Sequence, residues 1–376
     1  GEKMDFIDLN SQYNRIKTAV DERIQKVLDN SAYIMGKEVY ELEAKLAEYV
    51  GREYCLSCSN GTDAMVIPLM ALDVKEKDAF YVSSFTFFAS AEVVELVGGT
   101  PVFIDSDETY NLDPAHLELM INKTIQEGEL TPRGIIAVDI FGLVADYEAI
   151  EKIAQKYDLF LLSDAAQSFG GSRYGKKSCS FGDVATTSFF PAKPLGCYGD
   201  GGAIFTDDEE LYKVMESIRV HGQGETKYDN VRIGINGRLD TIQAAVLLEK
   251  MNILDAERET KLNIAKIYTE RLKENYCVPT FPENCESALA QYTILTKNAE
   301  HREKVIAYME SKNIPIMTYY RYPMHMQKAF AYLNYKDSDL PVAEDYSKRA
   351  ISIPIHAYLT EQDINLICQE LNKIAE

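Results

Sequence analysis

The amino-acid sequence predicts an α/β fold in which helices flank a mostly parallel central sheet, with a smaller α+β domain at the C-terminal end. Two observations lead to this prediction. Short apolar runs alternate with segments of helical periodicity as far as residue 206, which is typical of β-α-β units. Polar or glycine-rich stretches follow several of these apolar runs directly, as expected where ligands bind at the carboxyl ends of parallel strands.

The chain begins with two amphipathic helices. Apolar side chains recur at helical spacing over residues 13–27 and again over residues 39–49, on either side of Gly36. A strand at residues 54–57 comes next, followed by the turn Ser-Asn-Gly-Thr-Asp of residues 59–63 and the start of a third helix. This order of strand, turn and helix start opens the sheet-forming part of the chain.

The turn before the third helix is a candidate phosphate site. Backbone N–H groups at a helix start have no partner within the helix and carry positive partial charge. Gly61 and Thr62 are therefore able to bind a phosphate without any basic side chain. An Asn-Gly pair by itself more often marks an ordinary turn.

Strands and helices then alternate. We expect strands at residues 79–83, 101–104, 134–139, 159–163, 184–190 and 203–206, with helices at residues 115–121, at residues 146–156 and from residue 207 onward. Three phenyl rings, Phe85, Phe87 and Phe88, follow the first of these strands. Core packing explains two of them, and the third is free to lie flat on the ring of a ligand.

A carboxylate ends one of the expected strands. Asp164 comes directly after the apolar run of residues 159–163 and begins the sequence Asp-Ala-Ala-Gln-Ser. An aspartate in this place is often merely a helix cap, and the residues alone leave that interpretation ahead of a catalytic one.

The stretch of residues 188–203 contains the strongest signal for chemistry. It reads Ser-Phe-Phe-Pro-Ala-Lys-Pro-Leu-Gly-Cys-Tyr-Gly-Asp-Gly-Gly-Ala, so two prolines flank Lys193 and predict an extended backbone there. A lysine in a loop is usually a solvated charge. Here neighbouring phenyl rings favour a desolvated amine, which loses its proton easily and becomes a nucleophile able to form a Schiff base.

The remainder of the chain predicts a long helix and a small domain. A polar loop with Asn236 and Arg238 precedes a helix over residues 241–275, and we divide the chain into domains of residues 1–250 and 251–376. In the second domain we expect strands at residues 288–297 and 314–320, and helices at residues 299–312, 342–349 and 361–375. The planar fork of Arg238 suits a carboxylate, although a salt bridge within the fold explains it equally well.

Composition excludes several functional classes. A net charge of −20 over 376 residues disfavours nucleic acid and anionic membranes as partners. The seven cysteines are an odd number without framework spacing, which indicates reduced thiols, and we expect no metal site. With neither a long apolar run nor a signal-peptide pattern in the sequence, we expect a cytoplasmic protein.

The lysine stretch resembles the cofactor-lysine segment of the DegT/StrS-type sugar aminotransferases. Members of this family carry pyridoxal phosphate and act on nucleotide-linked keto-sugars. The resemblance implies a fold-type I transferase, a homodimer with shared active sites, and glutamate or 2-oxoglutarate as the second substrate. The amino-acid sequence around the lysine is most similar to that of the UDP-3-keto-N-acetylglucosaminuronate 3-aminotransferases, which serve polysaccharide or glycan biosynthesis.

The resemblance also implies roles for individual residues. Lys193 holds the cofactor, Asp164 meets its pyridine nitrogen, Gln167 lies near its ring hydroxyl and Phe87 stacks on its ring. The phosphate is bound by Gly61, Thr62 and Ser188, and by Asn236 of the neighbouring subunit. Arg238, Tyr319 and Tyr320 bind substrate; relatives commonly have His-Tyr where this chain has Tyr319-Tyr320.

Other functions stay open at this point. A dTDP-3-keto-6-deoxyhexose and a UDP-4-keto-6-deoxy sugar are alternative substrates. A sugar dehydratase of the same fold replaces the lysine with histidine, which disfavours it here because Lys193 is present. A non-catalytic regulatory or binding protein is disfavoured by the intact Lys193, Asp164 and Ser188.

Overall fold

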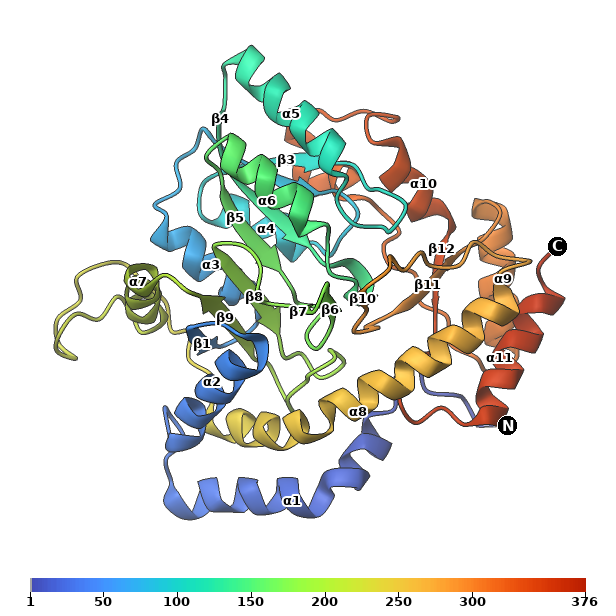
Figure 1. The fold of residues 1–376 in the computed structure, drawn as a ribbon, viewed down its shortest axis with the longest axis horizontal. Coiled ribbons are helices and arrows are strands. Elements are labelled where there is room, and N and C mark those ends of the chain that lie inside the picture. Colours follow the sequence, from blue (N-terminus) through green and yellow to red (C-terminus); the bar gives the residue numbers. More distant parts are fainter. Residues whose placement is uncertain (1) are drawn as a thin grey trace.

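The computed structural model describes residues 2–376 and is built around a central sheet (Figure 1). In the described chain this sheet has seven strands in the order β1-β9-β8-β5-β4-β2-β3. The strands are β1 (Tyr54–Cys58), β2 (Asp78–Ser83), β3 (Thr100–Ile104), β4 (Thr131–Val138), β5 (Phe160–Asp164), β8 (Val184–Ser188) and β9 (Gly202–Thr206). The five strands from β3 to β8 in this order are parallel, and β9 runs antiparallel to both β8 and β1. The prediction of a mostly parallel sheet is confirmed.

Helices cover the sheet and lead into it. They are α1 (Leu9–Asn30), α2 (Lys37–Val50), α3 (Gly61–Ala71), α4 (Ala89–Leu96), α5 (Pro114–Glu127), α6 (Tyr147–Lys156) and α7 (Glu209–Arg219). Side chains of a strand alternate between its two faces. On β2, Phe80 and Val82 therefore pack with α3 and α4, whereas Ala79 and Tyr81 pack with α5 and α6.

The C-terminal third contains a second, smaller core. The long helix α8 (Thr241–Leu272) packs against α11 (Glu361–Lys373) and against the strand pair β11 (Tyr292–Leu295) and β12 (Ala350–Ile353), with α9 (Ala299–Ser311) in the same cluster. Helix α10 (Pro341–Arg349) precedes β12. Short 3-10 helices lie at Ile140–Gly142, Met324–Met326 and Lys328–Leu333.

The predicted strand at residues 314–320 is wrong. Met317 makes only an isolated bridge to Ser352, and the segment then turns at Tyr319 and Tyr320, whose peptide bond is cis. Pro315 has no N–H to donate to a ladder. Ile314 and Ile316 owe their apolar character to burial in the C-terminal core rather than to a place in the sheet. The sequence patterns did not predict β12 or the small sheet β10-β6-β7, which is formed by Cys285–Glu286, Ser172–Arg173 and Lys176–Lys177.

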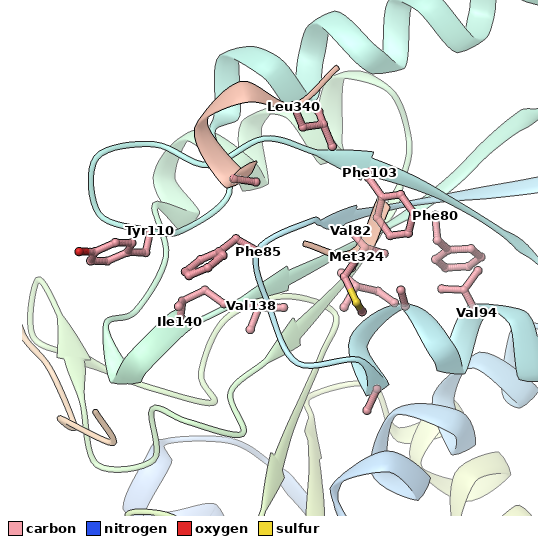
Figure 2. Close-up of a cluster of buried hydrophobic side chains, with 14 of the residues drawn as sticks. Phe80, Val82, Phe85, Val94, Phe103, Tyr110, Val138, Ile140, Met324 and Leu340 are labelled. Atoms are coloured by element: carbon pink, nitrogen blue, oxygen red, sulfur yellow. The ribbon is translucent and has the colours of Figure 1, made fainter. Parts of the chain in front are cut away.

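The two cores are not separated cleanly along the sequence. Figure 2 shows Met324 and Leu340 among Phe80, Val82 and Phe103 of the sheet cluster. Residues beyond 251 thus complete the core of the large sheet, as expected when a chain returns to cover an exposed apolar face. The division into domains at residue 250 stays a prediction.

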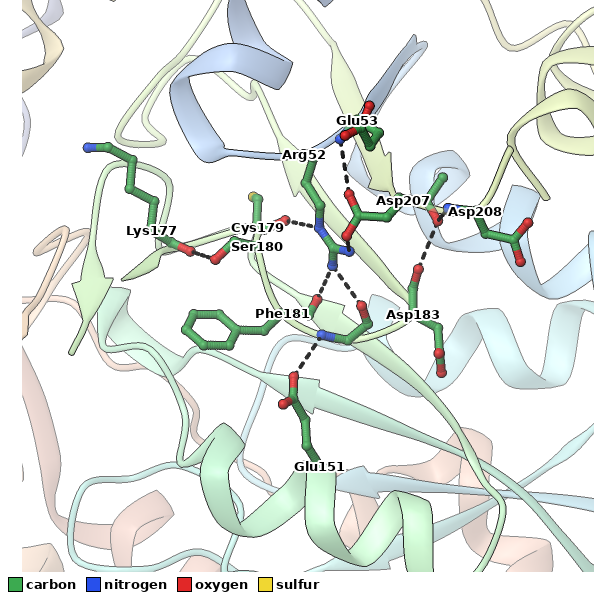
Figure 3. A network of polar contacts seen from close by, with 12 residues as sticks. Arg52, Glu53, Glu151, Lys177, Cys179, Ser180, Phe181, Asp183, Asp207 and Asp208 are labelled. Atoms are coloured by element: carbon green, nitrogen blue, oxygen red, sulfur yellow. Dashed lines mark hydrogen bonds and ion pairs between the residues drawn. The ribbon is translucent and has the colours of Figure 1, made fainter. Parts of the chain in front are cut away.

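A buried arginine anchors the loop that leads into β8 (Figure 3). Arg52, just after α2, donates to the carbonyl oxygens of Cys179, Phe181 and Gly182 at 3.0, 2.6 and 2.7 Å, and it pairs with Asp207 at 3.0 Å. The planar guanidinium satisfies several acceptors at once. The entry to β8, and through it the lysine stretch, is therefore tied to the start of β1.

Among residues 2–376, no helix combines the length and the apolar character that crossing a membrane requires. All seven cysteines are free thiols, and five of them are buried.

Candidate active site

The start of α3 and the end of β8 lie against each other. Asn60 caps α3 by accepting a hydrogen bond from the backbone N of Asp63 at 2.7 Å. A Cβ added to Gly61 would lie 2.7 Å from Ser188 Cβ and 3.1 Å from Ser188 Oγ, so only glycine fits there without displacement. The structure thus brings two predicted phosphate ligands, Gly61 and Ser188, to one helix N-terminus, with half-buried Thr62 next in the chain. Hydroxyl and helix amides together form a cradle suited to an anion.

Asp164 lies at the carboxyl end of β5 and is 3% exposed. Its Oδ2 accepts a hydrogen bond from Ser90 Oγ at 2.7 Å, and its Oδ1 accepts one from the backbone N of Ala166 at 3.2 Å. Burial raises the pKa of the Asp164 carboxyl, while Ser90, Ala166 and the charge of Lys193 each act to lower it. The helix-cap interpretation is wrong, because no helix follows Asp164: its bond to Ala166 lies within a turn, and its other partner lies on a distant element.

Gln167 links the edge of the sheet to the C-terminal part. Its Oε1 accepts from the backbone N of Phe141 at 2.7 Å, and its Nε2 donates to the hydroxyl of Tyr320 at 3.1 Å. Burial raises the pKa of the Tyr320 hydroxyl, which therefore stays protonated. Two residues predicted at separate parts of the site are thus in direct contact.

The lysine segment is a turn rather than the expected extended stretch. The backbone N of Lys193 donates to the carbonyl oxygen of Phe190 at 2.9 Å, which places Pro191 at the second position of the turn, where its restricted φ is favourable. A Cβ on Gly196 would lie 2.3 Å from the carbonyl oxygen of Pro191. The glycine therefore allows the chain to close tightly behind the lysine, which the flanking prolines did not reveal.

Burial lowers the pKa of the Lys193 amine, and the charge of Asp164 opposes this in part. Each group thus responds to the charge of the other. Within residues 2–376, Lys193 Nζ has no hydrogen-bond or ion-pair partner. A desolvated amine without a partner is a better nucleophile and base than a solvated one.

The three phenyl rings after β2 separate as expected. Phe85 is 0% exposed, Phe88 packs against the sheet core, and Phe87 is 57% exposed. An exposed phenyl ring at the same edge as Asp164 provides an apolar face for a planar ligand.

Asn236 and Arg238 lie near the base of the segment of residues 220–240, which joins α7 to α8 and in part projects from the body (Figure 1). The backbone N of Ser59 donates to the carbonyl oxygen of Gly237 at 3.0 Å, so the base of the segment lies beside the turn before α3. Asn236 is exposed, and its side chain has no hydrogen bond within the described residues. Arg238 is half-buried, and its Nε has no partner there.

The residues described so far suit a flat, anionic ligand with a reactive carbonyl. The helix cradle receives an anion, the buried acid receives a ring N–H, and the lysine amine attacks a carbonyl carbon. Ser90 was missed in the sequence analysis. It is 74 positions from Asp164, and no local spacing relates the two.

Known proteins are similar to this chain in sequence and in fold. A model of the DegT/DnrJ/EryC1/StrS aminotransferase family matches residues 14–372. The UDP-2-acetamido-2-deoxy-3-oxo-D-glucuronate aminotransferase of Pseudomonas aeruginosa is 45% identical over 372 residues, covering 98% of this chain and 99% of the relative. The crystal structure of a DegT DnrJ EryC1 StrS aminotransferase from Brucella abortus superimposes with a TM-score of 0.96 at 48% identity and 99% coverage of both chains. That of NtdA from Bacillus subtilis with bound cofactor PMP gives 0.90 at 26% identity, covering 99% of this chain and 85% of that one.

Proposed function

The chain belongs to the DegT/DnrJ/EryC1/StrS aminotransferase family, and on this premise we propose that it transfers the amino group of glutamate to C3 of a UDP-linked 3-keto-N-acetylglucosaminuronate. It is a pyridoxal 5′-phosphate-dependent aminotransferase of nucleotide-linked keto-sugars. Our proposal concerns the finer points: the sugar, the amino donor, the roles of individual residues and the dimer.

The arrangement of acid and amine carries the proposal. Bound cofactor supplies an electron sink for the carbanion that transamination requires. Lys193 Nζ would hold the cofactor and, once displaced by an amino substrate, would carry the proton from the amino-acid carbon to carbon C4′ of the cofactor, and in the second half-reaction from C4′ to the sugar carbon that receives the nitrogen. The lowered pKa of Lys193 supports this role, because the base must be unprotonated near neutral pH.

Other residues orient the cofactor. The Asp164 carboxylate would hold the proton of the ring nitrogen, and Gly61, Thr62 and Ser188 would bind the phosphate. Phe87 would cover one face of the ring and exclude water from it, and Gln167 would lie near the ring hydroxyl. The Gly61–Ser188 contact and the exposure of Phe87 support these assignments.

The proposed sugar rests on the Pseudomonas relative, whose name specifies a 3-oxo-D-glucuronate. Arg238 gives a physical reason for preferring an acidic sugar, because the Nε of its half-buried side chain has no partner within the described residues and a guanidinium group can bind a carboxylate bidentately. Tyr319 and Tyr320 provide the aromatic surface for the rest of the substrate.

We propose a homodimer in which the projecting segment reaches the neighbouring site. Its apolar side chains are unusually exposed: Tyr228 by 85%, Ile233 by 84% and Val231 by 53%. Exposed apolar groups in one segment indicate an interaction surface. In such a dimer Asn236 binds the phosphate held by the partner.

We also propose a reducing compartment, such as the cytoplasm, as the place where the protein acts. The seven free cysteines support this proposal.

A panel of nucleotide keto-sugars tests the proposal. The enzyme is mixed with glutamate and, in separate reactions, with UDP-3-keto-N-acetylglucosaminuronate, the same sugar without its carboxylate, a dTDP-3-keto-6-deoxyhexose or a UDP-4-keto-6-deoxy sugar. We expect amination at C3 of the acid, identified by mass and NMR, with kcat/KM at least about tenfold lower without the carboxylate. Equal use of the acidic and neutral sugars removes the role of Arg238, and amination of only a 6-deoxy sugar replaces the proposed substrate.

A further inference from the structure

Ser90 joins two elements that meet at the active site. It lies in the first turn of α4, is 1% exposed, and donates through Oγ to Asp164 Oδ2 at 2.7 Å. Within residues 2–376 this is the one side-chain hydrogen bond that Asp164 receives, because its other bond comes from the backbone of Ala166. A short hydrogen bond to a buried carboxylate is stronger than one between neutral groups.

The same helix start carries the exposed ring. The backbone N of Ser90 donates to the carbonyl oxygen of Phe87 at 3.2 Å. The turn at the start of α4 therefore carries both the hydroxyl that bonds to Asp164 and the Phe87 side chain. A planar cofactor between them would meet its acid and its stacking ring in a defined geometry.

We propose that Ser90 is a positioning residue for transamination, whose hydroxyl orients the Asp164 carboxylate and keeps it ionised opposite the cofactor ring nitrogen. This inference rests on the proposed role of Asp164. A buried carboxylate tends to take up a proton, and a protonated Asp164 no longer stabilises a proton on the ring. The Ser90 hydroxyl donates to the ionised form and so opposes that protonation.

The carboxylate of Asp139, which also lies at the carboxyl ends of the strands, differs from that of Asp164 in its hydrogen-bond partners. Asp139 accepts hydrogen bonds from Ser168 Oγ, Tyr147 OH and the backbone N of Ala145, and burial raises its pKa to about 7. Three donors from its own surroundings engage both of its oxygens. Asp164 has only two such bonds, which leaves acceptor capacity for a ligand.

Several titratable groups interact with Asp164 through their charge and belong to any account of its ionisation. They are Lys193 on the lysine loop, Asp139 after β4, Tyr147 on α6, Cys179 before β8 and Tyr320 in the C-terminal part. Lys193 favours the ionised form of Asp164, and Asp139 opposes it when charged. Ser90 differs from all of these because it does not titrate, so its removal changes the hydrogen bond and leaves the local charges in place.

The test compares Ser90→Ala, Ser90→Cys and Ser90→Thr in the holoenzyme, with Ser83→Ala as a matched control. Ser83 is also fully buried at the end of β2, but its hydroxyl has no partner within the described residues. We expect Ser90→Ala to lower kcat about tenfold, with KM changed less than about twofold, and to move the acid limb of the kcat–pH profile up by about one pH unit. Ser90→Cys introduces a weaker donor of similar size, so we expect it to change kcat and the pH profile in the same direction. We expect Ser90→Thr and Ser83→Ala to have the kcat and pH profile of the unmodified enzyme.

A second measurement does not depend on turnover. The absorbance of the bound cofactor is titrated with pH in the absence of substrate, and its dissociation constant is measured for each variant. An unchanged titration and kcat in both Ser90→Ala and Ser90→Cys would overturn the inference, as would equal losses in Ser83→Ala. If Ser90→Ala does not fold, Ser90→Cys is compared with Ser90→Thr, and equal kcat values and titrations in these two variants would overturn the inference.

The variant Asp164→Asn distinguishes a failure of the proposed role of Asp164 from a failure of the proposed role of Ser90. Normal turnover and an unchanged cofactor titration in Asp164→Asn would reject the proposed role of Asp164 itself. A loss in Asp164→Asn together with normal behaviour of the Ser90 variants would reject only the inference about Ser90.

Discussion

Two regions differ in whether a single chain supplies partners for their side chains: the carboxyl ends of the sheet strands, called the edge below, and the segment after α7. At the edge, Asp164 and Gln167 each find hydrogen-bond partners within the chain, and Gly61 lies against Ser188. In the projecting segment, Asn236, Tyr228 and Ile233 are exposed. Buried polar groups need hydrogen-bond partners within the folded chain. Exposed apolar groups contribute to stability only when another surface covers them and removes them from water.

This difference teaches which properties depend on a single chain. On the proposed function, the chemistry at Lys193 and Asp164 requires only the fold of its own subunit. The proposed binding of the phosphate by Asn236 requires a second copy of the chain. Mutations at the edge should therefore act within one subunit, whereas mutations in the segment should act across the dimer.

The largest expected effect tests the completed edge. Lys193→Ala should reduce turnover by at least about 10³-fold, because it removes both the attachment point and the base. Activity is measured by glutamate-dependent amination, and cofactor content by absorbance. Lys213→Ala, an exposed lysine on α7, serves as the control and should retain full turnover. Turnover of Lys193→Ala within tenfold of the unmodified enzyme would place the chemistry elsewhere.

The next effect sharpens the comparison directly. Lys193→Ala and Asn236→Ala, each inactive alone, are unfolded together, refolded and assayed. If sites are shared, a mixed dimer has one intact site, and random pairing restores about one quarter of the full activity. No recovery, with mixed dimers verified by differently tagged chains, means that Asn236 acts in its own subunit or not at all.

A smaller effect tests the surface of the segment. Ile233→Asp should weaken the dimer, raising its dissociation constant by about 10²- to 10⁴-fold, because the dimer covers two such isoleucines and each contributes about 1.5–3 kcal/mol. Analytical ultracentrifugation measures the change. Leu119→Asp on α5, with a leucine that is also largely exposed, is the control and should leave the dimer intact. Equal dissociation constants for both variants would contradict an interface at this segment.

The smallest effect concerns a buried charge beneath the lysine loop. Lys250 on α8 is 2% exposed, lies 4.6 Å from the centre of the Tyr198 ring, and has its pKa lowered by burial to about 8. Because the unfolded chain binds more protons between this value and the ordinary one, stability should rise as the pH increases from about 8 to 10.5. We expect Lys250→Met to remove as much as about 3 kcal/mol of that rise, the full contribution of this pKa difference.

Urea unfolding at several pH values measures the difference. Lys261, whose pKa is also lowered to about 8, contributes equally to both proteins and so cancels. A rise of the same size in the Lys250→Met variant would show that Lys250 is not the group responsible.

Local sequence patterns predicted most of the fold. The apolar runs that become β2, β4 and β5 and the periodicity of α1, α2 and α8 correspond to elements of the structure. The expected strand at residues 314–320 failed because its apolar residues belong to the small core without joining a ladder. Periodicity reports which residues are buried, not which neighbour covers them.

The candidate site was predicted in part. The lysine stretch and the residues around Asp164 resembled a known family, but their conformations and contacts did not follow from the sequence. Lys193 lies after a turn because Gly196 permits close packing behind it. The roles assigned to the site residues stay predictions until the variants described above are measured.

The sequence by itself determined most strands and helices of the large sheet, the apolar faces and the chemical types available at the site, because these depend on residues close together in the chain. Only the tertiary structure decided that Ser90 bonds to Asp164 across 74 positions and that Gln167 bonds to Tyr320 across 153. Such contacts form when packed elements bring distant side chains within hydrogen-bond distance, and the free energy of that packing is shared over the whole core rather than encoded in either residue.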